Sequence, residues 1–118
     1  MDNSDPTSQL QTADSISLAM ERLWTRFLPE ITQRITVIES AIDAIESNHG
    51  ADNLRGQAQI AAHKLAGSLG TFGLRQGTEI ARLIEQVFAP GEDPTNITTL
   101  RELTKQMRSI IESRPRNV

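Results

Sequence analysis

Histidine and cysteine, the side chains with the most distinctive chemistry near neutral pH, are scarce in this 118-residue chain. The chain contains two histidines, His49 and His63, and no cysteine, so disulfides, thiolate metal sites and cysteine nucleophiles are excluded. His63 is followed by three glycines, Gly67, Gly70 and Gly73. A neutral imidazole offers a nitrogen lone pair near neutral pH, so it can act as a nucleophile, a base or a ligand. His63 is therefore the first candidate for a reactive group.

The spacing of apolar residues around His63 predicts a helix over about residues 53–69. The residues at core spacing are Leu54, Ala58, Ala61, Leu65 and Leu69. At 100° per residue, His63 lies about 180° from Leu54, opposite this stripe. The residues around His63 on the outer face are mostly small, namely Gly56, Gln59, Ala66, Gly67 and Gly70. The imidazole is thus expected to be exposed among residues with little side chain.

These small residues indicate a surface that another protein approaches. Glycine in an exposed helix interior costs roughly 0.5–1 kcal/mol relative to alanine, and Gly67 lies one turn beyond His63. Without large side chains, a partner can bring its own reactive group close to the imidazole. A lone surface histidine is usually only solvated, and His49, in the turn from Ser47 to Asp52, keeps that interpretation.

The remaining apolar spacing predicts four further helices. A short helix is expected over about residues 15–28, with Pro29 as its boundary and one apolar face made of Ile16, Met20, Leu23, Trp24 and Phe27. The next, over about residues 30–47, has isoleucines at 4-3-4-3 spacing, namely Ile31, Ile35, Ile38, Ile42 and Ile45. The last two are expected over about residues 74–88 and from Thr95 or Asn96 to about Ser113.

The fold class predicted from these elements is all-α, because no segment alternates with period two. Four long amphipathic helices with short loops indicate an antiparallel up-down four-helix bundle, and the short first helix is expected to cap one end. Residues 1–14 are expected to be a flexible polar leader, residues 15–113 the bundle, and residues 114–118 a flexible C-terminus. A single strong apolar stripe on each long helix predicts a monomer.

Composition excludes several classes of function. The formal net charge is −3, which argues against nucleic acid as a partner, because binding phosphates needs clustered cations. No apolar run of about 20 residues is present, so no membrane span is expected. The absence of cysteine suits a cytoplasmic protein.

The segment from Ala62 to Gly73, AHKLAGSLGTFG, resembles the phosphohistidine motif of histidine-containing phosphotransfer (HPt) domains of bacterial two-component phosphorelays. The family pattern is roughly A-H-x-L-K-G-S-S. The resemblance implies a phosphocarrier in signal transduction, without autonomous catalytic activity. His63 would accept a phosphoryl group on Nε2 from a receiver aspartyl phosphate or a histidine kinase and pass it to a receiver aspartate. No cofactor or metal would be bound by this domain, and Mg²⁺ would come with the partner receiver.

The motif differs from the family pattern in its positive charge. The family usually has lysine three residues after the histidine, where this chain has Ala66. Lys64 lies about 100° around the helix from His63 and is no obvious substitute. Arg82 and Arg75, on the following helix, are the other candidates to supply positive charge, and the alternative for each is a solvated surface cation.

Other residues are expected to support His63. Glu85, 22 positions later, matches a glutamate that orients the histidine through Nδ1 in the phosphotransfer domains of chemotaxis kinases. Gln59, one turn before His63, is a candidate hydrogen-bond partner for the phosphoryl group. Partner docking is expected at Ala66, Gly67 and Gly70. For Glu85, a solvated position at the edge of the apolar stripe remains the alternative.

The sequence disfavours an enzyme and leaves an interaction module as the alternative to phosphotransfer. An enzyme is disfavoured, since no Ser-His-Asp set and no phosphate-binding glycine loop are present. A di-metal bundle would need several inward carboxylates and paired Glu-x-x-His motifs, which two histidines on different elements do not provide. The open alternative is an HPt-like interaction module that docks a signalling partner without phosphotransfer, which the replacement of lysine by Ala66 favours and the retained His63 opposes.

Overall fold

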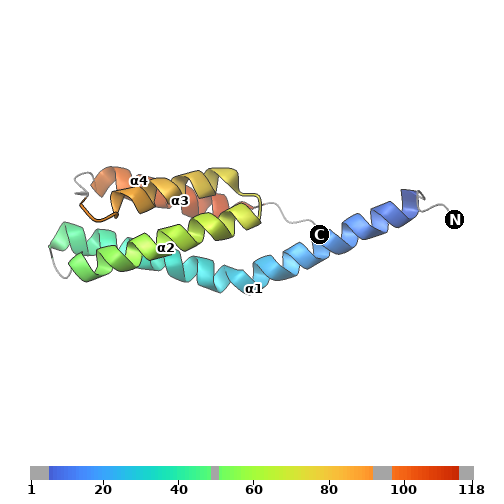
Figure 1. Cartoon of the computed structure of the whole chain (residues 1–118), viewed down its shortest axis with the longest axis horizontal. Coiled ribbons are helices and arrows are strands. Elements are labelled where there is room, and N and C mark those ends of the chain that lie inside the picture. The colour runs from blue at the N-terminus through green and yellow to red at the C-terminus, as the bar shows by residue number, and fades with distance from the viewer. Residues whose placement is uncertain (1–5, 49–50, 92–96, 115–118) are drawn as a thin grey trace.

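The computed structural model describes residues 6–48, 51–91 and 97–114, with side chains described from residue 13 onward. It contains four helices: α1 (Pro6–Ser47), α2 (Ala51–Thr71), α3 (Arg75–Val87) and α4 (Ile97–Glu112). No strand occurs in the described ranges, and the all-α prediction is confirmed. Each helix packs against two neighbours, in the cyclic order α1, α2, α3, α4 (Figure 1). This is the arrangement of an up-down four-helix bundle.

Helix α1 differs from the prediction of a separate N-terminal capping helix. It is one continuous helix of 42 residues with Pro29 inside it, so the predicted boundary at Pro29 is wrong. Proline removes one backbone donor and crowds the carbonyl four residues earlier, and Figure 1 shows α1 changing direction part-way along. Trp24 and Ile31 are both buried, so packing on each side of Pro29 holds the helix together.

At each end of the chain, part of the segment predicted to be flexible has a defined position in the structure. Residues 6–14, expected as part of a polar leader, belong to α1, and residues 1–5 lie outside the described part of the chain. At the other end, Arg114 was assigned to a flexible C-terminus, but its guanidinium pairs with Glu21 at 2.8 Å. It also lies 4.7 Å from the ring centre of Trp24, which contacts Phe72 edge to face. This cluster joins α1, the end of α2 and the end of α4.

The core is built mainly from isoleucine, leucine and alanine. Four isoleucines of the predicted stripe are buried and a fifth, Ile45, is partly buried; the four are Ile31, Ile35, Ile38 and Ile42. On α2, the predicted core residues Ala58, Ala61, Leu65 and Leu69 are buried. Of the apolar face predicted for residues 16–27, however, only Trp24 is buried, because this part of α1 extends past the other helices (Figure 1).

The α2–α3 turn sets the geometry of the site. Gly73 has φ of 74°, a left-handed conformation that glycine adopts without steric cost. The N–H of Leu74 donates to the carbonyl of Leu69 at 2.9 Å, and the N–H of Gly73 donates to Gly70 at 3.0 Å. These two bonds form a Schellman motif, which ends α2 and reverses the chain within three residues.

Candidate functional site

His63 lies on the outer face of α2, as its spacing from the core stripe predicts, and its side chain is 74% exposed. Its Nδ1 lies 2.8 Å from Oε2 of Glu85 on α3. A carboxylate can only accept a hydrogen bond, so this contact places the proton on Nδ1. Nε2 then carries the free lone pair and points away from Glu85.

The helix pair α2–α3 brings these two side chains together. Leu74 follows His63 by eleven positions (74 − 63) and precedes Glu85 by eleven (85 − 74), so both lie at one level of the antiparallel pair. One turn closer to the loop, the hydroxyl of Thr78 donates to the carbonyl of Ala66 at 3.0 Å. Because Thr78 is buried, this bond helps to fix the position of α3 against α2.

The small residues around His63 differ in how exposed they are and in what surrounds them. Gly56 and Gly67 are exposed, and a Cβ at either would have no atom within 4 Å, so nothing in the fold requires glycine there. Gly70 is exposed, and a Cβ there would lie 3.5 Å from the Thr78 hydroxyl. Ala66 is different, because it is only 7% exposed. Its predicted place on the docking surface is wrong: α2 packs against both α1 and α3, so its buried arc is wider than a single stripe.

A hollow of about 530 Å³ lies between α2 and α3 on the loop side of His63. It is lined by Gly70, Gly73, Arg75, Thr78, Glu79 and Arg82. Arg82 lies three residues before Glu85, on the next turn of α3 toward the loop. Both predicted arginines, Arg75 and Arg82, therefore line the same hollow. Lys64 is exposed on α2.

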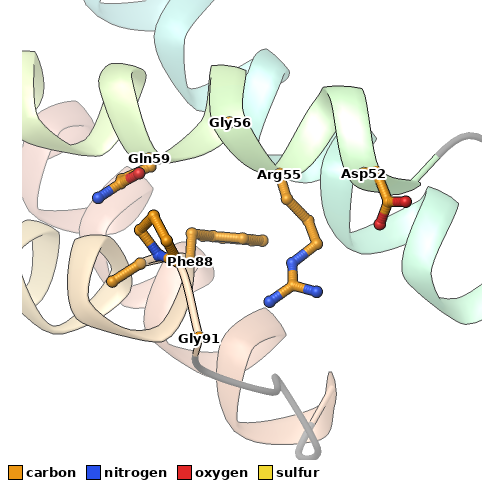
Figure 2. Close-up of a pocket in the computed structure, with 8 residues that line it drawn as sticks. Asp52, Arg55, Gly56, Gln59, Phe88 and Gly91 are labelled. Carbon is orange, nitrogen blue, oxygen red and sulfur yellow. The ribbon is translucent and has the colours of Figure 1, made fainter.

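A second hollow, of about 440 Å³, lies on the other side of His63. Gln59, Gly56, Arg55 and Asp52 line it from α2, and the segment from Phe88 to Gly91 closes it. Figure 2 shows the Arg55 side chain reaching from α2 toward the chain that follows α3, past Phe88. Gln59 thus borders this hollow one turn from His63. We call His63 and the residues that line the two hollows on either side of it along the chain of α2 the α2–α3 surface.

The comparison with protein families decides the identity of this bundle. The Hpt domain family matches residues 22–113, which is most of the chain. The chain belongs to the Hpt domain family. Hpt domains carry phosphoryl groups on histidine in phosphorelays, so the fold and the phosphotransfer resemblance agree.

A curated relative of this Hpt domain is Protein RcaC of Microchaete diplosiphon. The two are 35% identical over 66 residues, which is 56% of this chain and 10% of the relative. The chain therefore spans only about a tenth of the length of that protein. No solved structure matches the chain.

Two further findings bear on the chemistry of this Hpt domain. Among the described residues, no group of three or more His, Cys, Asp or Glu side chains could hold a metal ion. In the same part of the chain, no helix has the length and apolar character that a membrane span requires.

His49 lies outside the described residues, so its predicted solvated position stays a prediction.

One exposed apolar residue close to His63, Ile60, was not singled out from the sequence. Ile60 lies three residues before His63 on α2 and is 58% exposed. Helical spacing places Ile60 outside the core stripe and about 60° from His63, so its outward position follows from the sequence.

Proposed function

We propose that His63 is the phosphoacceptor of this Hpt domain and that Nε2 is the reacting atom. The observation that supports this most directly is the contact between Nδ1 and Glu85 at 2.8 Å on a side chain that is otherwise exposed. The contact selects the tautomer in which Nε2 keeps its lone pair. The same contact holds the ring in one orientation, as phosphoryl transfer requires alignment of donor and acceptor.

Phosphoryl transfer to Nε2 needs no proton from solvent, because Nδ1 keeps its proton throughout the step. The Nε2 lone pair attacks the phosphorus of an aspartyl phosphate, the P–N bond forms, and the P–O bond breaks with its electrons returning to the carboxylate. The ring then carries a positive charge that Glu85 partly neutralises through Nδ1–H. When the phosphoryl group moves on to a second aspartate, the P–N electrons return to Nε2 and the ring is neutral again.

Other residues of the α2–α3 surface are proposed to support the phosphorylated form. Arg82 carries a positive charge one turn of α3 from Glu85, and we assign to it the charge that the family lysine supplies elsewhere. Gln59 is proposed to donate a hydrogen bond to a phosphoryl oxygen from the opposite side. Lys64, exposed next to His63, adds to the positive field. Mg²⁺ is expected to arrive with the partner receiver.

The partner of this surface is proposed to be the receiver domain of a response regulator, with a histidine kinase as the other possible donor. Gly67 and Gly70 leave space for the partner, and Ile60 offers an apolar contact beside the histidine. A few residues near the centre of an interface usually carry most of its binding energy, and Ile60 is placed to be one of them. The docking surface is thus Ile60, His63, Gly67 and Gly70.

The alternative is an interaction module that docks the same partner without phosphotransfer. The presence of Ala66 in place of the family lysine supports it. The two proposals differ in chemistry and share the docking surface, so a substitution at His63 separates them.

The test is incorporation of acid-labile phosphate from a phosphorylated receiver domain, with His63→Gln and His49→Gln as the matched variants. We expect His63→Gln to lose phosphate uptake while its helical circular dichroism is retained. Its stability should change by no more than about 0.5 kcal/mol, because the side chain is exposed. Normal uptake by His63→Gln would reject the assignment. Binding of a receiver to the wild-type chain without any phosphate uptake would support the interaction module.

A further inference from the structure

Thr78 joins two helices through its hydroxyl. The hydroxyl donates to the carbonyl of Ala66 at 3.0 Å and so ties α3 to the backbone of α2. Other hydroxyls of the described residues, such as those of Thr71 and Thr104, donate to carbonyls four positions earlier in their own helix. Thr78 and Thr104 are the two buried polar side chains in the described residues, and of these two only Thr78 bonds to another helix.

The backbones of α2 and α3 come close at Thr78 because small residues line both helices there. A Cβ at Gly70 would lie 3.5 Å from the Thr78 hydroxyl, and a Cβ at Gly77 would lie 2.9 Å from Cδ1 of Leu69. At this separation the hydroxyl reaches a backbone carbonyl of the other helix. The oxygen of Ala66 can accept this bond in addition to its helical one, because a carbonyl has two lone pairs.

Thr78 and Glu85 lie on the same face of α3. They are seven positions apart (85 − 78), which is about two turns, and they differ by about 20° around the helix axis. On α2, Ala66 lies three positions after His63, or about one turn. The bond from Thr78 to Ala66 and the 2.8 Å contact between Glu85 and His63 are thus two polar contacts along the same helix pair.

The rotation of α3 about its axis depends more on the Thr78 bond than on apolar packing. Ala81 and Ile84, which lie between Thr78 and Glu85 in the chain, are fully buried. Apolar burial is non-directional, whereas a hydrogen bond requires both a distance and an angle. The Glu85 side chain lies at the edge of α3 and is 28% exposed, so its distance from His63 changes when α3 rotates.

We propose that Thr78 is a positioning residue for phosphotransfer, because its bond to Ala66 sets the rotation and spacing of α3 that keep Glu85 in contact with Nδ1 of His63. The inference rests on the proposed role of His63 as phosphoacceptor. Thr78 is distinct from the reacting groups and acts through Glu85. Loss of its hydroxyl should therefore lower the population of the tautomer with the proton on Nδ1, which is the one that leaves the Nε2 lone pair free.

The test compares Thr78→Val with Thr78→Ser in the full chain. Valine removes the hydroxyl and places a methyl group near the Ala66 carbonyl, where a carbon–oxygen contact needs about 3.3–3.6 Å, whereas serine keeps the bond. At pH 8, ¹⁵N NMR of the His63 ring should show more protonation on Nε2 in Thr78→Val and the wild-type tautomer in Thr78→Ser. Phosphate uptake from a phosphorylated receiver domain should slow by about threefold in Thr78→Val and recover in Thr78→Ser.

Two controls separate positioning from stability. Thr104 is also buried, but its hydroxyl donates to Leu100 within α4, so Thr104→Val should keep the wild-type tautomer and uptake even if it lowers stability. The double variant Thr78→Val/Glu85→Gln should take up phosphate no more slowly than Glu85→Gln alone. Two residues that act through one contact are not additive in their effects.

The proposal is overturned by a wild-type tautomer or a wild-type rate of uptake in folded Thr78→Val, or by equal effects of Thr104→Val. It is also overturned if the Thr78 substitution slows Glu85→Gln by the same factor as it slows the wild type. Helical circular dichroism shows whether Thr78→Val folds, and Thr78→Ala, which removes the hydroxyl without adding bulk, replaces it if it does not. The tautomer is read without phosphotransfer, so failure of His63 as phosphoacceptor, seen as normal uptake by His63→Gln, is distinguishable from failure of Thr78.

Discussion

Nδ1 of His63 and Oε2 of Glu85 lie 2.8 Å apart across the groove between α2 and α3. The Schellman turn at Gly73 determines this relationship, because it places the two residues at the same level of an antiparallel helix pair. The imidazole is thereby oriented by a residue on another helix, although most of its surface faces solvent. A change in Glu85 should consequently alter the chemistry at Nε2 without altering the fold.

Glu85→Gln tests this orientation. We expect phosphate uptake to slow by several-fold to about tenfold, because a charge-assisted hydrogen bond is replaced by a neutral one on a mostly exposed ring. At pH 8, ¹⁵N NMR of the wild-type ring should show the proton on Nδ1, and the variant should show a larger population with the proton on Nε2. Glu102→Gln, an exposed glutamate of α4, should match the wild type in both measurements. An unchanged tautomer and rate in Glu85→Gln would assign Glu85 to solvent.

Substitutions at Gly67 should affect the free energy of unfolding and the rate of phosphotransfer in different ways. Gly67→Ala should raise the free energy of unfolding by roughly 0.5–1 kcal/mol, since a Cβ there meets no other atom within 4 Å. It should leave phosphotransfer nearly unchanged. Gly67→Lys should give a similar rise in stability but slow transfer from a receiver domain at least about tenfold, because a long side chain occupies the docking surface. Thermal unfolding and transfer kinetics on the same preparations check both effects. Equal transfer rates for the two variants would remove Gly67 from that surface.

Gly77 and Gly56 should respond to alanine in opposite directions. A Cβ at Gly77 would lie 2.9 Å from Cδ1 of Leu69 and 3.6 Å from Cγ2 of Ile110. Leu69 is fully buried, so its side chain would have to shift within the packed core, and Gly77→Ala should lower the unfolding free energy by about 1–2 kcal/mol. Gly56→Ala is the control, and its open surroundings predict a rise of about 0.5–1 kcal/mol. Urea unfolding measures both changes, and a stabilised Gly77→Ala would show that the core repacks freely.

Arg114 should contribute more stability than the exposed ion pairs of α4. Its side chain and that of Glu21 are 10% and 16% exposed, and the guanidinium also covers Trp24. Arg114→Ala should cost about 1–3 kcal/mol, because it leaves a poorly solvated carboxylate without its partner. Trp24 is the single tryptophan, so its fluorescence emission should shift to longer wavelength in that variant.

Arg101→Ala is the control for Arg114. Arg101 pairs with Asp43 and Glu46, and these hydrogen bonds raise the pKa of Arg101 above its ordinary value. Its side chain is nevertheless well exposed, so its loss should cost at most about 1 kcal/mol. A larger loss in Arg101→Ala than in Arg114→Ala would contradict the ranking by burial.

The sequence predicted the parts of the molecule that follow helical periodicity. The outward position of His63 and the isoleucine stripe of α1 needed only a regular helix and were confirmed. The helix boundary predicted at Pro29 is wrong, because burial of Trp24 and Ile31 outweighs the local cost of proline within α1. Ala66 was misplaced because periodicity of one helix does not show that α2 has two neighbours. The contact of Arg114 with Glu21 spans 93 positions, and no local pattern encodes such a pair.

The described parts of the site all lie on one helical hairpin, with His63 and Glu85 only 22 positions apart. Contacts at such short sequence separation cost little chain entropy to form, and bundles rich in them fold in microseconds to milliseconds. The isoleucines that stabilise the hairpin come from α1, whose contacts with α4 close a much longer loop. The geometry of the His63–Glu85 pair is thus set by residues close together in the chain. The stability of that geometry depends on packing between residues far apart in the chain. Substitutions in the α1 core should therefore shorten the lifetime of the folded state before they change the chemistry at His63.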